Sequence, residues 1–241
     1  MTAILTATVG SACGSAPTRA AAPTTPRDPG HASQAHDHDH GGATHHGHGG
    51  PSAFVDADAL AKVFDDPSRD EWQRPADVLR ALELDPAMTV ADVGAGTGYF
   101  AVRLAAAVSQ GEVIATDLEP DMVRYLNERA RREQLPNLRA IQATPTASGL
   151  AAGSVDRILV LHVWHHLANR AGYARDLAHA LRPGGRLFVV DFSPSSDRGP
   201  PTNMRVASAV VVAELEDAGL SASVSATALP GQYIVDARRA P

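Results

Sequence analysis

Three glycines and two carboxylates in the middle of the chain have a spacing that suits the binding of a small polar ligand. Gly94, Gly96 and Gly98 follow the apolar stretch TVADV, which contains the first carboxylate, Asp92. Glycine has no Cβ, so the backbone of such a loop can approach a ligand closely. The second carboxylate, Asp117, follows after roughly twenty residues, the spacing at which an acidic side chain reaches ribose hydroxyls. Together these residues predict a site for a nucleoside-like ligand.

The details of this loop argue against a dinucleotide. The NAD fingerprint reads G-x-G-x-x-G, and the place of its third glycine is taken by Tyr99. A pyrophosphate binds at a helix N-terminus that is free of nearby negative charge, so Asp92 would repel it. The same carboxylate suits an ammonium group. We therefore expect a cationic ligand without phosphates, with NAD as the alternative.

A second group of reactive side chains follows the fourth strand that the sequence predicts. His162, Trp164, His165 and His166 lie close together there, and Asp191 ends the next predicted strand. An imidazole can act as a general base near neutral pH. We expect His165 to be a catalytic base, with His166 and Asp191 as further catalytic candidates and His162 turned toward the ligand. In the alternative interpretation, these histidines only cap or pack against the next helix.

The elements that position these residues alternate between strands and helices. Strand patterns cover residues 89–93, 112–117, 138–143, part of 154–163, 185–192, 221–228 and 232–237. Helical patterns cover residues 99–109, 119–134, 173–185 and 205–220. Such alternation predicts an α/β fold with a mostly parallel, doubly wound sheet and helices on both faces, a three-layer α/β/α arrangement. Its ligand lies at the carboxyl ends of the strands, where the Gly loop, Asp117 and the histidines are expected.

The bulk composition fits one globular α/β domain with a tail. The chain has 241 residues, of which 44% are hydrophobic and 20% are charged. Its net charge of −6 argues against nucleic acid as a partner, because nucleic-acid binders usually carry a basic face. No apolar run reaches the roughly 18 residues that a membrane-spanning helix needs.

Residues 1–50 differ in composition from the rest and are expected to be a disordered tail. They hold seven of the eleven histidines. Imidazoles in such a tract suit zinc, copper or nickel, so we expect weak transition-metal binding that is not catalytic; the alternative is a solvated linker. The candidate metal ligands are His36, His38, His40, His45, His46 and His48.

The single cysteine raises a question of location. Small residues lead to Cys13, as in a lipoprotein signal over residues 1–13, but no lysine or arginine precedes the apolar part. A signal peptide normally begins with a basic segment. We therefore expect a cytoplasmic protein, and keep as the alternative a membrane-anchored form lipidated at Cys13.

Four stretches in this order resemble the class I S-adenosylmethionine-dependent methyltransferases. They are VADVGAGTGYF, VIATDLEPDMV, SVDRILVLHVWHHL and LRPGGRLFVVDF. The resemblance implies a Rossmann-like sheet of seven strands with an antiparallel last strand, spanning residues 89–241, and a helical lid segment over residues 51–88. It implies in-line methyl transfer from S-adenosylmethionine to a small-molecule acceptor, as in the branch that makes ubiquinone and menaquinone.

The resemblance also implies roles for individual residues. Asp92 suits the ammonium group of the cofactor, Asp117 the ribose and Leu118 the adenine, and Thr144 or a backbone carbonyl would receive the adenine amino group. Trp72 and Gln73 could close over the cofactor. The complete set of expected cofactor-binding residues is Asp92, Gly94, Ala95, Gly96, Gly98, Asp117, Leu118, Thr144, His162 and Gln73.

Two features of the sequence argue against particular subclasses of methyltransferase. The fourth strand is not followed by an Asn/Asp-Pro-Pro-aromatic motif, and the domain has no cysteine. Methylation of nucleic-acid bases and thiol-dependent arsenic methylation are therefore not expected. Two other classes stay open: a metal-handling protein in which the domain does not catalyse, and an S-adenosylmethionine-binding regulator without turnover.

Overall fold

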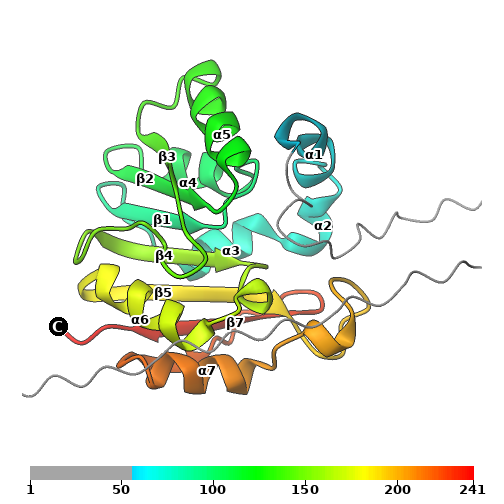
Figure 1. Cartoon of the computed structure of the whole chain (residues 1–241), viewed down its shortest axis with the longest axis vertical. Coiled ribbons are helices and arrows are strands. Elements are labelled where there is room, and N and C mark those ends of the chain that lie inside the picture. The colour runs from blue at the N-terminus through cyan, green and yellow to red at the C-terminus, as the bar shows by residue number, and fades with distance from the viewer. Residues whose placement is uncertain (1–55) are drawn as a thin grey trace, which may run out of the picture. The chain divides into compact units, whose positions relative to one another are not determined.

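A computed structural model describes residues 56–241. The predicted metal-binding histidines and the possible signal ending at Cys13 lie outside the described residues. Within the described part, seven strands form one sheet in the order β3-β2-β1-β4-β5-β7-β6 (Figure 1). The strands are β1 Thr89–Val93, β2 Glu112–Asp117, β3 Leu138–Gln142, β4 Val155–Leu161, β5 Leu181–Phe192, β6 Ser221–Val224 and β7 Gln232–Arg238.

The strand directions confirm the predicted sheet. The neighbouring strands from β3 to β5 are all parallel, whereas β7 lies between β5 and β6 and runs antiparallel to both. The first strand, β1, has β2 on one side and β4 on the other. The strand order therefore reverses at β1, and in sheets of this kind the ligand crevice opens beside that point, at the carboxyl ends.

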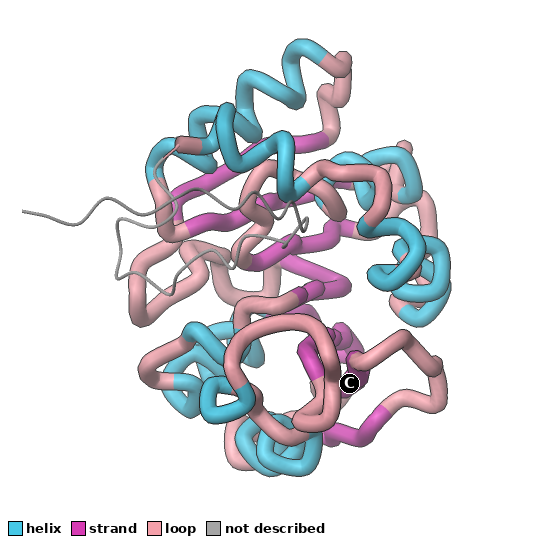
Figure 2. The backbone as a smooth tube through the Cα atoms, turned by 90° about the vertical axis from the view of Figure 1, so that its right-hand side faces the viewer, coloured by secondary structure: helices cyan, strands magenta, loops and turns pink. Residues whose placement is uncertain are grey.

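Helices cover both faces of the sheet, as predicted (Figure 2). Because successive side chains of a strand point to opposite faces, each central strand contributes to two cores. In β5, Leu187 packs into the core that also contains Leu177 and Leu215, and Phe188 packs into the core that contains Leu104 and Leu126. The helices are α1 Ala57–Phe64, α2 Arg69–Gln73, α3 Pro75–Ala81, α4 Ala101–Ala107, α5 Pro120–Arg132, α6 Arg170–Ala180 and α7 Ser208–Glu216.

One predicted boundary was wrong. The helix expected to be stopped by Pro183 and Gly184 ends earlier, at Ala180. The reason is that Leu181 already pairs with Val155 of β4, and regular pairing resumes at Arg186 after a register shift. The turn at Pro183, with Gly184 at φ 74°, therefore lies inside β5 and does not end the helix.

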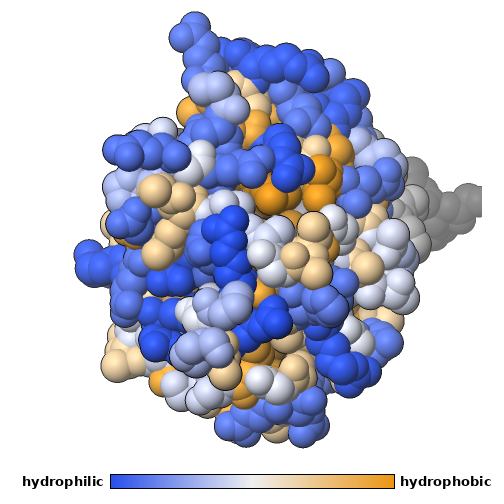
Figure 3. Space-filling view, turned by 90° about the vertical axis from the view of Figure 1, so that its left-hand side faces the viewer, coloured by the Kyte–Doolittle hydropathy of each residue, from blue (hydrophilic) through white to orange (hydrophobic). Residues whose placement is uncertain are grey.

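The amino ends of the parallel strands lie at the edge of the sheet opposite the Gly loop. Seen from that side, the surface is mostly hydrophilic, with apolar areas between the polar ones (Figure 3). Within residues 56–241, no helix has the length and apolar character needed to cross a membrane.

Candidate active site

The loop between β1 and α4 is held by glycine conformations and by backbone hydrogen bonds. Gly94, Gly96 and Gly98 have φ values of 69°, 57° and 97°, a region that glycine enters without strain. The N–H groups of Gly94 and Ala95 both donate to the carbonyl of Thr116, at 2.8 and 3.0 Å. The loop is thereby fixed to the end of β2.

The three glycines differ in what surrounds them. A Cβ at Gly94 would collide with Val163, and a Cβ at Gly98 would collide with Leu126. A Cβ at Gly96 would meet only Phe64, at an ordinary contact distance of 3.5 Å. Packing inside the protein therefore requires the first and third glycines, whereas at the second only the positive φ favours glycine.

Asp92 is a buried carboxylate that lacks a complete set of partners. Its side chain is 3% exposed, and its Oδ2 atom has no hydrogen-bond partner among the described residues. Burial and the nearby charge of Asp117 raise the pKa of Asp92 to about 7, although a hydrogen bond from the backbone of Ala101 opposes this. A buried polar atom without a partner is costly, and an ammonium group placed here would remove that cost.

Asp117 ends β2 directly beside the Gly loop. Its Oδ2 accepts the N–H of Gly96 at 2.8 Å, and its Oδ1 accepts the N–H of Glu119 at 3.0 Å. Burial raises its pKa, while these backbone hydrogen bonds lower it. Each carboxylate oxygen has a second lone pair, so Asp117 can also accept hydrogen bonds from a ligand.

The residues expected near the adenine follow β2 and β3. Leu118 is 42% exposed, which is unusual for a large apolar side chain in this chain. The loop after β3 lies beside it, because the N–H of Ala143 donates to the carbonyl of Asp117 at 2.8 Å. Thr144 is exposed and uses its hydroxyl to accept the N–H of Ala147 at 3.0 Å. The adenine contact of Thr144 stays a prediction.

Helices α1 and α2 lie on the same side as the Gly loop, where the parallel strands end (Figure 1). Helix α1 packs against α5, and the N–H of Ala57 donates to Asp121 at 2.8 Å. Asp65 accepts hydrogen bonds from Arg129 at 2.8 Å and from Thr97 of the loop at 3.2 Å. These contacts tie α1 to α5 and to the Gly loop, and the role of this segment as a lid stays a prediction.

An aromatic layer lies between this segment and the ends of β4 and β5. The ring of His162 stacks on Phe192 at a centroid distance of 4.0 Å and is parallel to Trp72 at 5.8 Å. His162 has φ 57°, uncommon for a residue with a Cβ. Burial lowers its pKa to about 4, so the ring is neutral at pH 7.

Gln232, which sequence reasoning missed, joins the aromatic layer to the lid segment. Its Oε1 accepts from His162 Nε2 and from Gln73 Nε2, both at 2.8 Å, and its Nε2 donates to the carbonyl of Trp72 at 2.9 Å. That carbonyl needs a donor, so Oε1 must be the acceptor and His162 carries its proton on Nε2. Gln73, expected on the cofactor, is fully buried and uses its amide in this network.

His165 and Asp191 form a buried pair. His165 Nδ1 lies 2.8 Å from Asp191 Oδ1, and the two side chains are 3% and 2% exposed. Asp191 also accepts the N–H of Phe192 at 2.8 Å and that of His165 at 3.2 Å. A carboxylate that accepts from Nδ1–H leaves the lone pair on Nε2, the arrangement of an oriented general base.

The other two residues of this turn behave differently. Trp164 is not available to a bound ligand, because it is fully buried in the core. Its Nε1–H donates to Glu214 at 2.8 Å. His166 is exposed, with its ring 4.1 Å from that of His165. The short 3-10 turn over Trp164–His166 thus directs Trp164 into the core and leaves His166 at the surface.

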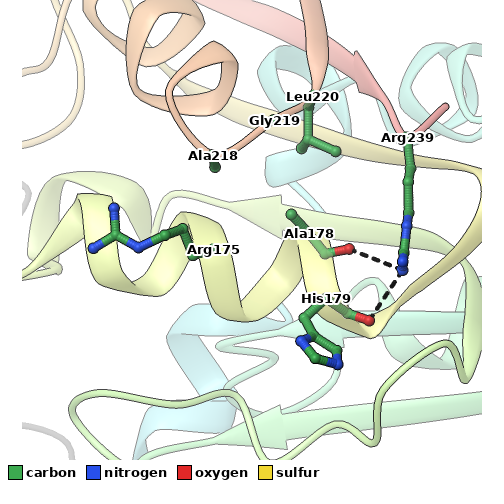
Figure 4. A pocket seen from close by; sticks show the side chains of 7 residues that line it. All are labelled: Arg175, Ala178, His179, Ala218, Gly219, Leu220 and Arg239. Carbon is green, nitrogen blue, oxygen red and sulfur yellow. Dashed lines mark hydrogen bonds between the residues drawn. The ribbon is translucent and has the colours of Figure 1, made fainter.

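Two cavities lie away from these residues. One, of about 260 Å³, is lined by Arg175, His179 and Arg239 among others. There Arg239 donates to the carbonyls of Ala178 and His179 (Figure 4), which satisfies the end of α6. The other, of about 430 Å³, lies against Ile114 and Ile141. The lining of neither includes the Gly loop or the histidines at the ends of β4 and β5.

Comparison with known proteins supports this geometry. A family model described as "Methyltransferase domain" matches residues 91–189. The ubiquinone/menaquinone biosynthesis C-methyltransferase of Syntrophotalea carbinolica is 31% identical over 51% of this chain and 50% of its own length. The trans-aconitate 2-methyltransferase of an Azoarcus strain is 35% identical over 50% of this chain and 46% of its own. The chain spans about half the length of the curated relatives it matches.

A solved structure extends the match over nearly the whole domain. The SAM-dependent methyltransferase of Aquifex aeolicus has a TM-score of 0.69 and 30% identity, covering 76% of this chain and 98% of that protein. This chain therefore belongs to the S-adenosylmethionine-dependent methyltransferases, and S-adenosylmethionine is the cofactor of that family.

The contacts of the site residues fit this cofactor. The partnerless oxygen of Asp92 can receive an ammonium group. The remaining lone pairs of Asp117 can receive ribose hydroxyls, and the exposed face of Leu118 can cover a flat base. Among the described residues there is no cluster that could hold a metal ion.

Proposed function

We propose that this chain transfers a methyl group from S-adenosylmethionine to a small-molecule acceptor at the carboxyl edge of the sheet. The observation that carries the proposal is the partnerless, buried oxygen of Asp92, two residues before the Gly loop. A buried carboxylate oxygen without a hydrogen-bond partner destabilises the fold. Its presence is explained if the oxygen binds a ligand. The alternative of a metal-handling protein has no support in the comparisons.

Each cofactor-binding residue has a distinct task in this proposal. Asp92 binds the ammonium group, and Gly96 leaves room for the backbone to approach the methionine part. Asp117, held in place by the N–H groups of Gly96 and Glu119, accepts from the ribose hydroxyls, and Leu118 covers the adenine. The bound cofactor supplies a methyl group on a sulfonium, which is a good leaving group.

The acceptor side has two histidines with different properties. His165 presents Nε2 as a lone pair because Asp191 holds its Nδ1–H, so it can remove a proton from an acceptor hydroxyl, amine or acidic carbon. His162 is held neutral and presents Nδ1 as a weaker hydrogen-bond acceptor. Aligning the acceptor and excluding water supply the rest of the catalytic effect.

The aromatic layer favours an acceptor with a flat face. Trp72, His162 and Phe192 present stacked rings at the edge where the acceptor must lie. The relatives include a C-methyltransferase of quinone biosynthesis and a methyltransferase of a tricarboxylate. A reduced naphthoquinone and trans-aconitate are therefore sensible first acceptors to test.

The test is a transfer assay with methyl-labelled S-adenosylmethionine. The full chain is incubated with menadiol, with simple catechols and with trans-aconitate, and both label in the acceptor and S-adenosylhomocysteine are measured. We expect equal amounts of the two products for at least one acceptor, a strong loss in His165→Gln, and no loss in His179→Gln, on the far side of α6. Tight cofactor binding with no transfer to any acceptor would favour the regulator without turnover.

We also propose the cytoplasm as the place of this reaction, because S-adenosylmethionine is made and kept there. The mass of the native N-terminus tests this placement. A diacylglyceryl-modified Cys13 as first residue would favour the membrane-anchored alternative.

A further inference from the structure

Arg69, the first residue of α2, is a largely buried cation for which the described residues provide no ion pair. Its Nη1 donates to the carbonyl of Phe64, and its Nη2 donates to Gln73 Oε1 at 3.3 Å. Both of these partners are neutral. The guanidinium carbon lies 4.0 Å from the centre of the Tyr99 ring, so the group is stacked at the end of the Gly loop.

The acidic residues around Arg69 are already occupied. Asp65 is paired with Arg129 at 2.8 Å, and Asp70 is paired with Arg103 at 3.1 Å and accepts from the hydroxyl of Tyr99. Arg69 therefore forms no ion pair with a carboxylate in residues 56–241. Burial lowers the pKa of Arg69, and the nearby charges of Asp65 and Asp70 offset this only in part, because the buried guanidinium loses its contact with water.

The guanidinium lies between two aromatic residues of the site region, since its carbon is 4.0 Å from the centre of the Tyr99 ring and 5.9 Å from that of Trp72. It lowers the pKa of Asp92 and also that of His162, so the guanidinium lies within electrostatic range of both the cofactor side and the acceptor side. Asp92 lacks a cation and Arg69 lacks an anion. A ligand that carries an ammonium group and a carboxylate on one carbon would satisfy both at once, and an arginine fork can bind a carboxylate through two hydrogen bonds.

We propose that Arg69 is the carboxylate-binding residue of this site. Its ligand is either the α-carboxylate of the cofactor's methionine part or a carboxylate on the acceptor. The proposal rests on the proposed function, since it assumes that S-adenosylmethionine binds between Asp92 and the lid segment. In the bound state, Arg69 also ties α2 to the ligand, so the lid segment closes only over a ligand with the right charge.

The experiment compares two nucleosides on the full chain by calorimetry. S-adenosylhomocysteine carries the amino-acid part, whereas 5′-methylthioadenosine lacks it. We expect Arg69→Gln to weaken the binding of S-adenosylhomocysteine by about 10- to 100-fold, the size of one charge-assisted contact. The affinity for 5′-methylthioadenosine should stay unchanged. Unchanged binding of the second nucleoside also shows that the variant is folded. Arg69→Lys should recover part of the affinity.

The matched control is Arg103→Gln. Arg103 lies over the same Tyr99 ring at 4.0 Å but is paired with Asp70, so both nucleosides should bind this variant as they bind the wild type. The second arm uses benzoate as the probe on protein loaded with S-adenosylhomocysteine. If Arg69→Gln abolishes only benzoate binding, the carboxylate belongs to the acceptor.

The outcomes separate the two proposals. Unchanged S-adenosylhomocysteine affinity in Arg69→Gln, without any Arg69-dependent benzoate binding, would overturn the role of Arg69 and leave the methyltransferase proposal standing. If the wild type bound neither nucleoside, the proposed function itself would fail, and the role of Arg69 with it.

Discussion

The imidazole of His165 is hydrogen-bonded through Nδ1 to Oδ1 of Asp191 at 2.8 Å, with both side chains almost fully buried. These residues end or follow neighbouring parallel strands, β4 and β5. Asp191 is itself fixed by the N–H groups of Phe192 and His165. The pair is therefore oriented before any ligand arrives, which is what a general base requires.

Replacing Asp191 by Asn should disturb the protonation of His165 more than its position. The amide has a similar shape but can donate to Nδ1, which would move the ring proton to Nε2. We expect the methyl-transfer rate to fall by about 100-fold, a typical value for a misprotonated general base. Nitrogen NMR of labelled histidine reads the tautomer directly. An unchanged rate together with a shifted tautomer would show that the acceptor needs no base.

Asp92→Asn should stabilise the ligand-free protein while weakening cofactor binding. The folded pKa of about 7 lies above the usual aspartate value of 3.8, so the folded state binds more protons than the unfolded state between these values. Stability is therefore lost as the pH rises from about 4 to 7, by up to about 4 kcal/mol. The Asn variant avoids that loss, and its melting temperature at pH 8 should exceed that of the wild type.

The same carboxylate should make cofactor affinity depend on pH. Ammonium binding needs the ionised form, so wild-type affinity for S-adenosylhomocysteine should rise between pH 6 and pH 8, and this rise should vanish in Asp92→Asn. A variant that is less stable than the wild type at pH 8 and binds equally well would contradict the assignment.

Replacing each of the first two glycines of the loop by Ala should have a different effect. Gly94→Ala drives a Cβ into Val163 and should lower stability, and Val163→Ala should restore part of it. Gly96→Ala meets no close neighbour, so it should cost only the strain of a positive φ, about 1 kcal/mol, while cofactor affinity falls strongly. Thermal unfolding and calorimetry on the three variants test this contrast, and equal effects on affinity and stability would contradict it.

His162 should stay neutral down to a pH of about 4. Its folded pKa lies below the usual histidine value of 6.5 because of burial, so its contribution to stability is complete above pH 6.5 and is lost as the pH falls toward 4. The measurement is an NMR titration of the His162 ring. Titration of His162 near 6.5 would show that the ring is not buried in solution.

Deleting residues 1–50 should remove most zinc, copper or nickel binding and leave cofactor affinity unchanged. The expectation follows from seven histidines in that segment and from the absence of a metal-binding cluster among residues 56–241. Equilibrium dialysis on both forms measures it. Metal binding that survives the deletion would place the ligands in the domain.

The parts of the site that the sequence could predict depend on local pattern. The apolar strands, the Gly loop and the carboxylates at strand ends are all visible within a few residues, and parallel strands must end at one edge. His165 and Asp191 could thus be placed at the same edge, although their hydrogen bond could not be foreseen.

The rest depends on contacts between distant segments. Gln232 lies 70 residues from His162 and 159 from Gln73, and no local pattern marks it as their partner. Trp164 resembled a ligand-facing residue because it lies between histidines, but the 3-10 turn directs it into the core. Arg69 lacked any signal, since only the folded structure shows that Asp65 and Asp70 are paired elsewhere.

The most direct test of the central claim is a calorimetric titration of the full chain with S-adenosylhomocysteine and, separately, with NAD. We predict that S-adenosylhomocysteine binds one site per chain and that NAD does not bind. In Asp117→Ala the affinity for S-adenosylhomocysteine should fall by about 10- to 100-fold, because the ribose hydroxyls lose a charged acceptor. Failure of the wild type to bind S-adenosylhomocysteine, or full affinity in Asp117→Ala, would contradict the assignment of this edge as the cofactor site.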